Sequence, residues 1–193
     1  MVKIQKLNID RTKLRPLESG KNYFKSLIRS IIFQQLSGKA AAAIFTKFKM
    51  LFGKRFPKPQ DVLNMSNEKL RGAGLSRTKI VYLKDLAAKF LDGTVGQKQF
   101  SKMTDEEIIE HLVQVKGIGP WTAHMFLIFT LNRPDVLPTG DLAIRKGFQK
   151  AFKLRTLPHH EKMVALARPH AGERTYLSLH LWQLLDGGGG EDW

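Results

Sequence analysis

The chain has 193 residues, of which 42% are hydrophobic, enough to bury the core of one domain or of two closely packed lobes. Lys and Arg number 32 against 17 Asp and Glu, so the formal net charge is +15. This charge indicates a polyanionic partner such as DNA, with an anionic membrane surface as the alternative. No apolar run approaches the roughly 20 residues that a membrane span requires, and no signal peptide is recognised. The chain contains no Cys, which excludes disulfides, thiolate zinc sites and Cys-ligated iron–sulfur clusters.

Apolar residues recur at steps of three and four along most of the chain, which predicts an all-α fold. Alternation typical of a strand is limited to a short stretch at Val2, Ile4 and Leu7. The segment containing Pro57 and Pro59 is predicted to be a loop. The predicted helices, in chain order, are residues 24–32, 40–52, 66–72, 76–93, 104–115, 120–131, 142–152, 160–167 and 173–185.

Polar residues at several predicted helix starts support these assignments. Ser66 and Ser76 are suited to be N-caps, and Thr104 with Glu107 forms a capping box. We expect a single domain over residues 1–186, made of two helical lobes. Residues 187–193 contain four consecutive Gly and are predicted to form a flexible tail.

Two predicted helices are joined by the sequence Lys116-Gly117-Ile118-Gly119, and Pro120 opens the second, so residues 112–131 form a helical hairpin. Gly permits a positive φ angle and lets a phosphate approach the backbone. Pro suits the first turn of a helix because its missing N–H would have no intrahelical partner. The exposed amides and the positive end of the second helix can bind a DNA phosphate without reading sequence, and Lys116 adds charge. The alternative is an ordinary tight connection between two core helices.

The segment Leu112–Ala123, followed by Asp141, resembles the helix-hairpin-helix plus Gly-Pro-Asp (HhH-GPD) signature of base-excision DNA glycosylases. Gly119, Pro120 and Asp141 match the named elements of this signature. The sequence Ser30-Ile31-Ile32-Phe33-Gln34-Gln35-Leu36-Ser37 is similar to the segment that these enzymes use near the damaged base.

Within this superfamily the best resemblance is to the DNA-3-methyladenine glycosylase II family. It extends over roughly residues 22–185 and leaves out the extra N-terminal β-rich domain of the longer bacterial members. The resemblance implies an all-α fold of two lobes with a DNA-binding cleft between them. It also implies a monofunctional enzyme of base excision repair, which flips an alkylated base out of duplex DNA and hydrolyses its N-glycosidic bond to leave an abasic site.

Asp141 is the candidate catalytic residue. Cleavage of an N-glycosidic bond builds positive charge on the deoxyribose, which a carboxylate can stabilise, and a carboxylate can also direct a water nucleophile. The sequence Pro138-Thr139-Gly140-Asp141-Leu142 resembles the segment that carries the catalytic aspartate of the family. The alternative role is that of a plain helix N-cap, and both roles can coexist. Asp135 is a competing carboxylate but is better interpreted as a loop residue.

The resemblance also implies that the enzyme does not cut the DNA strand. Bifunctional relatives use a Lys in the second hairpin helix to form a Schiff base with the sugar. Trp121 stands at the matching position here, and an indole cannot form that imine. The lack of Cys likewise separates the chain from the iron–sulfur branch.

A flipped base needs a flat apolar surface, and electron-rich rings attract a cationic alkylated base. Trp121, Trp182 and Tyr176 are the aromatic candidates for this base pocket, and Trp182 resembles the stacking tryptophan of the family. Met125 stands where some relatives carry a tyrosine, which leaves the substrate range open. Aromatic residues at helical spacing are otherwise typical of a core.

A side chain must fill the hole that a flipped base leaves in the DNA stack. Gln35 resembles the wedge of the family, with Gln34 and Leu36 as neighbours able to contact the lesion or the opposite strand; a polar edge of the first core helix is the alternative. The predicted DNA phosphate contacts are Lys116, Gly117, Ile118, Gly119, Thr122, Ser76, Arg77, Lys79, Arg145 and Lys146.

We expect no catalytic metal, because the six His lack ligand spacing. We expect no other cofactor, although the resemblance suggests a structural monovalent cation at the hairpin carbonyls.

The expected partner of the monomeric protein is double-stranded DNA with damaged bases, and a membrane is not expected as a partner. In a bacterium the expected location is the cytoplasm, in association with the nucleoid. In a eukaryote it is the nucleus.

Other functions stay open on sequence alone. A non-catalytic module for DNA binding or damage recognition would need the same charge and hairpin. A helix-turn-helix regulator fits less well, because the Gly-x-Gly-Pro turn suits phosphate capture better than insertion of a recognition helix. Within the enzyme class, hypoxanthine, uracil and ethenoadenine are further candidate substrates.

Overall fold

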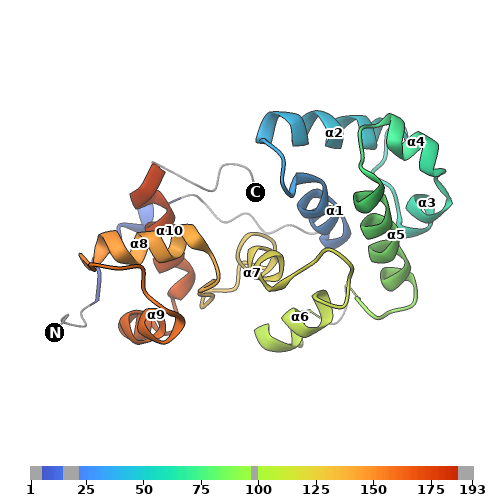
Figure 1. Cartoon of the computed structure of the whole chain (residues 1–193). Helices are drawn as coiled ribbons and strands as arrows, with labels where there is room; N and C mark the ends of the chain where they lie inside the picture. The colour runs from blue at the N-terminus through green and yellow to red at the C-terminus, as the bar shows by residue number, and fades with distance from the viewer. Residues whose placement is uncertain (1–5, 15–21, 97–99, 187–193) are drawn as a thin grey trace. The chain divides into compact units, whose positions relative to one another are not determined.

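A computed structural model describes residues 6–14, 22–96 and 100–186 of the protein (Figure 1). These residues form ten α-helices and two 3-10 helices and contain no strand, which confirms the predicted all-α fold for this part of the chain. The helices are η1 (Arg11–Lys13), α1 (Tyr23–Phe33), α2 (Gly38–Met50), α3 (Pro59–Asn64), α4 (Asn67–Gly72), α5 (Arg77–Leu91), α6 (Asp105–Leu112), α7 (Pro120–Phe129), α8 (Leu142–Ala151), α9 (His160–Ala167), η2 (Arg168–His170) and α10 (Arg174–Asp186). None of these helices is both long and apolar enough to cross a membrane.

The described residues divide into two compact units. Residues 22–96 and 100–126 form the first, called here the hairpin unit. Residues 6–14 and 127–186 form the second, called the aspartate unit. The division falls inside α7, so this helix contributes residues to both units.

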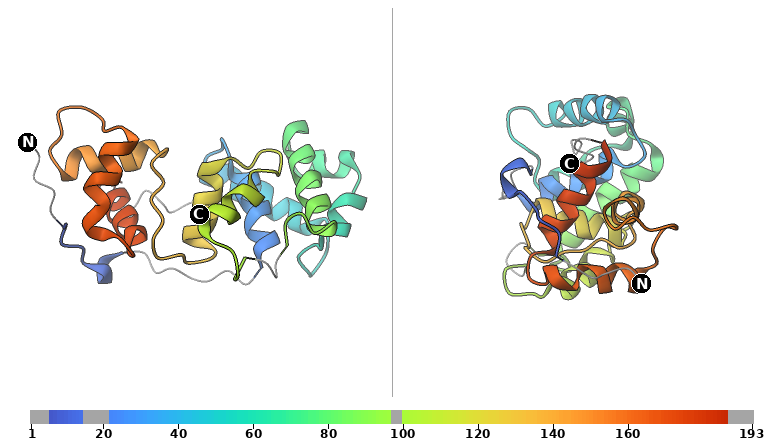
Figure 2. Two further views of the ribbon diagram at one scale, coloured as in Figure 1. Left: turned by 90° about the horizontal axis from the view of Figure 1, so that it is seen from below. Right: turned by 90° about the vertical axis from the view of Figure 1, so that its left-hand side faces the viewer.

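The core of the hairpin unit forms around α1, whose apolar stripe is buried. Leu27, Ile28 and Ile31 have no exposed surface, as their spacing predicts. Asn22 starts the helix by accepting a hydrogen bond from the Lys25 amide at 2.9 Å. Helix α1 packs against α2 and α5, and α3 packs against α5 (Figures 1 and 2). This packing brings the turn that follows α1 next to α5.

In the aspartate unit, α8 and α10 lie side by side in close contact (Figure 2). Gly147 on α8 permits this approach, because a Cβ added there would lie 2.8 Å from both the Cβ atom and the carbonyl oxygen of Leu181 on α10. Phe148 and Leu177 are fully buried on the same two helices. The close contact fixes the start of α8, and with it Asp141, against α10.

The helix α3 was not predicted, and the prediction of a loop through Pro57 and Pro59 is wrong at its end. The helix begins at Pro59, which occupies the first turn, where its missing N–H has no cost. Asp61 completes the start by accepting a hydrogen bond from the Lys58 amide at 2.8 Å. The other predicted helices are present, with ends that differ by a few residues.

Two predictions concern the ends of the chain. The predicted strand positions Val2 and Ile4 and the predicted tail, residues 187–193, lie outside the described residues. Leu7, the third strand position, lies in an irregular segment. Its amide donates a hydrogen bond to Nε2 of His170 at 3.0 Å, which joins this segment to η2 in the aspartate unit.

Candidate active site

The turn of the hairpin is a compact structure that requires glycine at one position. It follows α6, which starts with the predicted capping box of Thr104 and Glu107. The Ile118 amide donates to the Val115 carbonyl at 3.0 Å, which closes the turn. Gly117 has a φ angle of +83°, and a Cβ added there would lie 2.1 Å from the ring of Tyr82. The turn therefore packs on α5 in a form that other residues would strain.

The end of this turn, where α7 begins, is suited to hold an anion. Pro120 begins α7, and the first-turn amides of a helix have no intrahelical partner and lie at its positive end. A Cβ added at Gly119 would meet nothing within 4 Å, so the backbone is approachable there. Lys116 is exposed, and its amide is taken by Asp85, which accepts at 2.8 Å and forms an ion pair with Lys89. The amides from Gly119 onward are thus the better phosphate ligands.

The predicted wedge residues form the turn between α1 and α2. Gln35 has a φ angle of +57°, in the left-handed region that few non-Gly residues adopt, and its side chain is exposed. Leu36 is 39% exposed. Gln34 turns inward instead: its Nε2 donates to the Gly117 carbonyl at 2.8 Å and to Oγ1 of Thr122 at 3.4 Å. The tip of the turn is Gln35 and Leu36, while Gln34 joins it to the hairpin.

The remaining predicted phosphate contacts of the hairpin unit differ in what their side chains do. Ser76 caps α5 by accepting from the Lys79 amide at 3.2 Å, and Arg77 is exposed. The ammonium group of Lys79 donates to two carbonyls of the protein itself, those of Ile32 at 2.6 Å and Gln34 at 2.8 Å. No local pattern of residues predicts this contact, because Lys79 is far from residues 32 and 34 in the chain.

Two predicted pocket residues on α7 differ in exposure. Trp121 is 37% exposed, so part of its ring can meet a ligand. Met125 is 2% exposed and belongs to the core of the hairpin unit. Thr122 lies between them in sequence and is also buried.

Asp141 is a buried carboxylate with a fixed orientation in the aspartate unit. Its side chain caps α8, because Oδ1 accepts a hydrogen bond from the Ile144 amide at 2.8 Å. The same oxygen accepts from the indole Nε1 of Trp182 on α10 at 3.3 Å. Asp141 is 9% exposed and Trp182 is 6% exposed. A carboxylate that is held in this way can stabilise developing positive charge without having to reorganise.

Trp182 is itself positioned by a second aromatic ring. Phe129 stacks on it with ring centroids 5.9 Å apart and an interplanar angle of 24°. The indole is therefore held both by its N–H group and by one face. Asp141 and Trp182 are thus hydrogen-bonded to each other within one unit.

Asp135, the competing carboxylate, has a structural partner. Both of its oxygens accept from the Arg174 guanidinium at 2.6 Å, and Oδ1 also accepts from the Arg174 amide at 3.0 Å. Hydrogen bonds from Arg174 lower the pKa of Asp135. This pair closes the loop after α7 onto the start of α10, so Asp135 is better explained as a structural residue.

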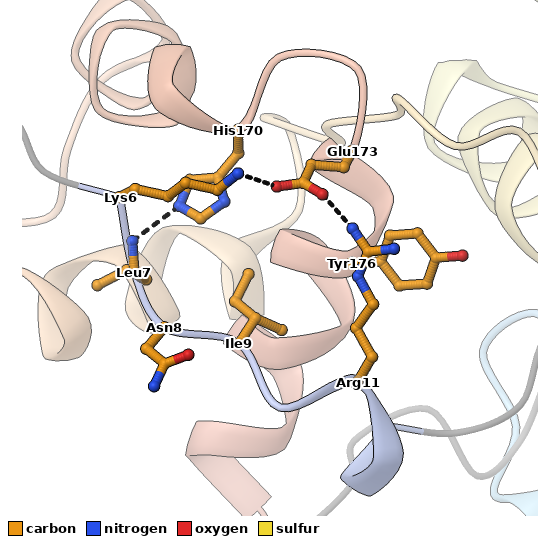
Figure 3. Close-up of a pocket in the computed structure, with 8 residues that line it drawn as sticks. All are labelled: Lys6, Leu7, Asn8, Ile9, Arg11, His170, Glu173 and Tyr176. Carbon is orange, nitrogen blue, oxygen red and sulfur yellow. Dashed lines mark hydrogen bonds and ion pairs between the residues drawn. The ribbon is translucent and has the colours of Figure 1, made fainter.

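Tyr176 lies in a different environment from Trp182. Figure 3 shows it at a pocket of about 430 Å³, where the Arg11 guanidinium lies over its ring at 4.0 Å from the centroid. Lys6 and Arg11 both pair with Glu173 at this pocket. The residues that line it are Lys6, Leu7, Asn8, Ile9, Arg11, His170, Glu173 and Tyr176. Since Trp182 does not line this pocket, Tyr176 and Trp182 need not serve one ligand.

The two predicted phosphate contacts on α8 also differ. Arg145 is half-buried, and its Nε donates to the Pro158 carbonyl at 3.2 Å. Lys146 is exposed. Of the two, Lys146 is the more accessible to a phosphate.

The described residues contain no group of three or more His, Asp or Glu placed to hold a metal ion. Backbone carbonyls are suitable ligands for a monovalent cation, which leaves the hairpin to consider. The Val115 carbonyl already accepts from Ile118, and the Gly117 carbonyl accepts from Gln34. Each oxygen retains one lone pair, so a cation fits there only beside these bonds.

Residues 28–169 match the HhH-GPD superfamily of base excision DNA repair proteins. The chain is 39% identical over 165 residues to DNA-3-methyladenine glycosylase 1 of Schizosaccharomyces pombe, an alignment that covers 84% of this chain and 72% of the relative. Among solved structures, 3-methyladenine DNA glycosylase of S. pombe in complex with abasic DNA is similar with a TM-score of 0.75 and 34% identity, over 90% of this chain and 87% of that one. A DNA-3-methyladenine glycosidase from Bacillus halodurans is similar with a TM-score of 0.80 and 34% identity, over 88% and 78% of the two chains.

Proposed function

Because the chain belongs to the HhH-GPD superfamily of base excision DNA repair proteins, we propose that it is a DNA glycosylase for alkylated bases of the 3-methyladenine type. The reaction hydrolyses the N-glycosidic bond of a flipped base and leaves an abasic site. The observation that carries this proposal is the buried Asp141 carboxylate, which the Ile144 amide and the Trp182 indole hold in one orientation.

The chemistry follows from where charge develops. As the bond between the base and C1′ breaks, its electron pair leaves with the base and the sugar becomes positive. The Asp141 carboxylate stabilises this charge electrostatically. A water molecule then adds to C1′ and loses one proton, to Asp141 or to solvent, so the products are the free base and the abasic sugar. A base that carries a positive charge from alkylation leaves as a neutral molecule, so it needs no proton from the protein.

Duplex DNA is the substrate. The protein is proposed to bind it through two sets of contacts, one to the DNA backbone and one to the flipped base. The amides from Gly119 onward and the charge of Lys116 are suited to one phosphate, and the net charge of +15 supports contacts along the backbone. Gln35 and Leu36 are the proposed wedge. Trp121, at 37% exposure, is the accessible stacking surface of the proposal, whereas Trp182 is 6% exposed with Phe129 over one face. A cationic base gains roughly 0.5–2 kcal/mol from an aromatic ring.

The proposed reaction does not use Tyr176, Met125 or a hairpin cation. Tyr176 is engaged with Arg11, and Met125 is buried. A cation at the hairpin would supply one more positive charge near a phosphate, and no step of the reaction depends on it. The protein is proposed to act as a monomer wherever it meets genomic DNA, at the nucleoid in a bacterium or in the nucleus of a eukaryote.

The proposal predicts base release from methylated DNA. The purified protein is incubated with duplex DNA treated with a methylating agent, and free bases are separated by chromatography. We expect 3-methyladenine in the soluble fraction and an equal number of alkali-labile abasic sites. Duplexes with a single hypoxanthine, uracil or ethenoadenine, tested in parallel, define the substrate range. Tight binding to all duplexes with no base released from any would favour a non-catalytic DNA-binding module instead.

We further propose that the enzyme has no lyase activity, because Trp121 replaces the Schiff-base lysine of bifunctional relatives. Incubation with lesion DNA and sodium borohydride is expected to trap no covalent protein–DNA complex, although base release proceeds. A bifunctional glycosylase treated in the same way is the positive control. A trapped complex with this protein would show that another amine performs the attack.

A further inference from the structure

The turn that follows α1 is held by a lysine from another helix. Lys79, in the first turn of α5, donates from its ammonium group to the carbonyls of Ile32 and Gln34, at 2.6 and 2.8 Å. Carbonyls at the end of a helix lack intrahelical donors and lie at its negative end. Lys79 is half-buried, and burial lowers the pKa of its amine. A desolvated ammonium at 2.6–2.8 Å from two oxygens is a specific contact, unlike the exposed Arg77 on the same helix.

A second side chain ties the same turn to the hairpin. The Gln34 side chain donates to the Gly117 carbonyl at 2.8 Å and to Oγ1 of Thr122 at 3.4 Å. Gly117 lies in the turn proposed to grip phosphate, and Thr122 lies in the first turn of α7. The backbone and the side chain of Gln34 are therefore held by different elements, α5 and the hairpin.

These contacts support a backbone that would otherwise be unfavourable. Gln35 has a φ angle of +57°, a conformation that persists in a non-Gly residue only where its surroundings enforce it. Gln35 and Leu36, at the tip of the turn, are exposed. The turn is thus a rigid base with two projecting side chains.

We propose that Lys79 and Gln34 are positioning residues that hold Gln35 and Leu36 ready for insertion into the DNA stack and couple this turn to the phosphate-binding hairpin. This inference rests on the proposed function, and it assigns Lys79 a role inside the protein in place of a phosphate contact. The Gln34 contact then keeps the wedge at a fixed spacing from a phosphate bound at the hairpin.

The test uses Lys79→Met and Gln34→Met, which remove the donor and keep an unbranched side chain of equal length at position 34 and one atom shorter at position 79. Lys84→Met, on the same helix α5, is the control for loss of one positive charge. The DNA is a duplex with a stable abasic analogue opposite 2-aminopurine, whose fluorescence rises when a wedge unstacks it. Affinity is measured over a range of salt concentrations, and single-turnover base release is measured on 3-methyladenine or ethenoadenine DNA.

We expect both variants to bind the abasic duplex within about threefold of Lys84→Met, with an unchanged salt slope. We expect their 2-aminopurine signal to fall at least twofold and their rate of base release at least tenfold. Hydrogen exchange of the amides of residues 34–37 in the free protein is expected to become faster. Equal fluorescence and exchange in Lys79→Met and Lys84→Met would overturn the inference. So would a loss of affinity with a salt slope reduced by about one, since this is the result for a phosphate contact.

The readouts separate this inference from the proposed function. Fluorescence, affinity and hydrogen exchange need no catalysis, so they test the turn even if the wild-type protein releases no base. Should Lys79→Met fail to fold, Gln34→Met still tests the connection to the hairpin, because it removes a partly exposed amide and no buried charge.

Discussion

Replacing Asp141 with Asn is expected to lower the rate of base release by roughly a thousandfold, the scale found when a preorganised electrostatic group is removed from an active site. Asn has the same shape and retains an oxygen that can accept from the Ile144 amide, so the cap of α8 is preserved. What is lost is the negative charge that is proposed to stabilise the sugar. The affinity for a duplex with an abasic analogue should change by no more than a few fold.

The measurement is single-turnover release from one lesion duplex at saturating enzyme, with affinity determined separately. Asp135→Asn is the matched control, since it neutralises the neighbouring carboxylate and weakens its pair with Arg174. This control should reduce thermal stability and leave base release within a few fold. If Asp141→Asn retains wild-type release, or if Asp135→Asn alone abolishes it, then the assignment of the catalytic carboxylate is wrong.

Gly147→Ala is expected to reduce the free energy of unfolding by about 2 kcal/mol, a typical cost of overpacking a close contact. The added methyl group would lie 2.8 Å from the Leu181 carbonyl oxygen and from its Cβ atom. Backbone cannot move aside as the end of a long side chain can, so α8 and α10 must separate. Because these helices carry Asp141 and Trp182, base release should fall together with stability.

Urea unfolding followed by tryptophan fluorescence measures this cost. Gly72→Ala at the end of α4 is the control, since a Cβ there would meet nothing within 4 Å. It should be neutral or slightly stabilising, because Ala restricts the unfolded chain more than Gly does. Equal stability of the two variants would show that α8 and α10 tolerate a wider spacing.

Much of the fold follows from local sequence signals. The periodic apolar residues of α1 predict its buried face, and the caps at Ser66, Ser76 and Thr104 predict three helix starts. These features involve residues three or four positions apart, where geometry is set by the helix itself. Helix α3 was not predicted because Pro57 and Pro59 were interpreted as breakers, although Pro59 stands at the position where a helix tolerates it.

The candidate site is less local, and sequence predicts only part of it. Asp141 could be identified because both a cap and a family signature mark it. The partners of Lys79 could not, since residues 32 and 34 come next to it only through the packing of α1 on α5. Tyr176 was grouped with Trp182 because both are aromatic and lie on α10. They are six positions apart, which is not a spacing that shares a helix face.

The hydrogen bonds to Asp141 have a further consequence. Both N–H groups, from Ile144 and from Trp182, reach the same oxygen, so the two carboxylate oxygens are inequivalent. A half-turn of the carboxylate would exchange them only by breaking and remaking both bonds. A glutamate would bring an identical charge, yet its additional methylene would carry the oxygens past both donors. This position therefore requires a side chain of the length of Asp as well as a negative charge.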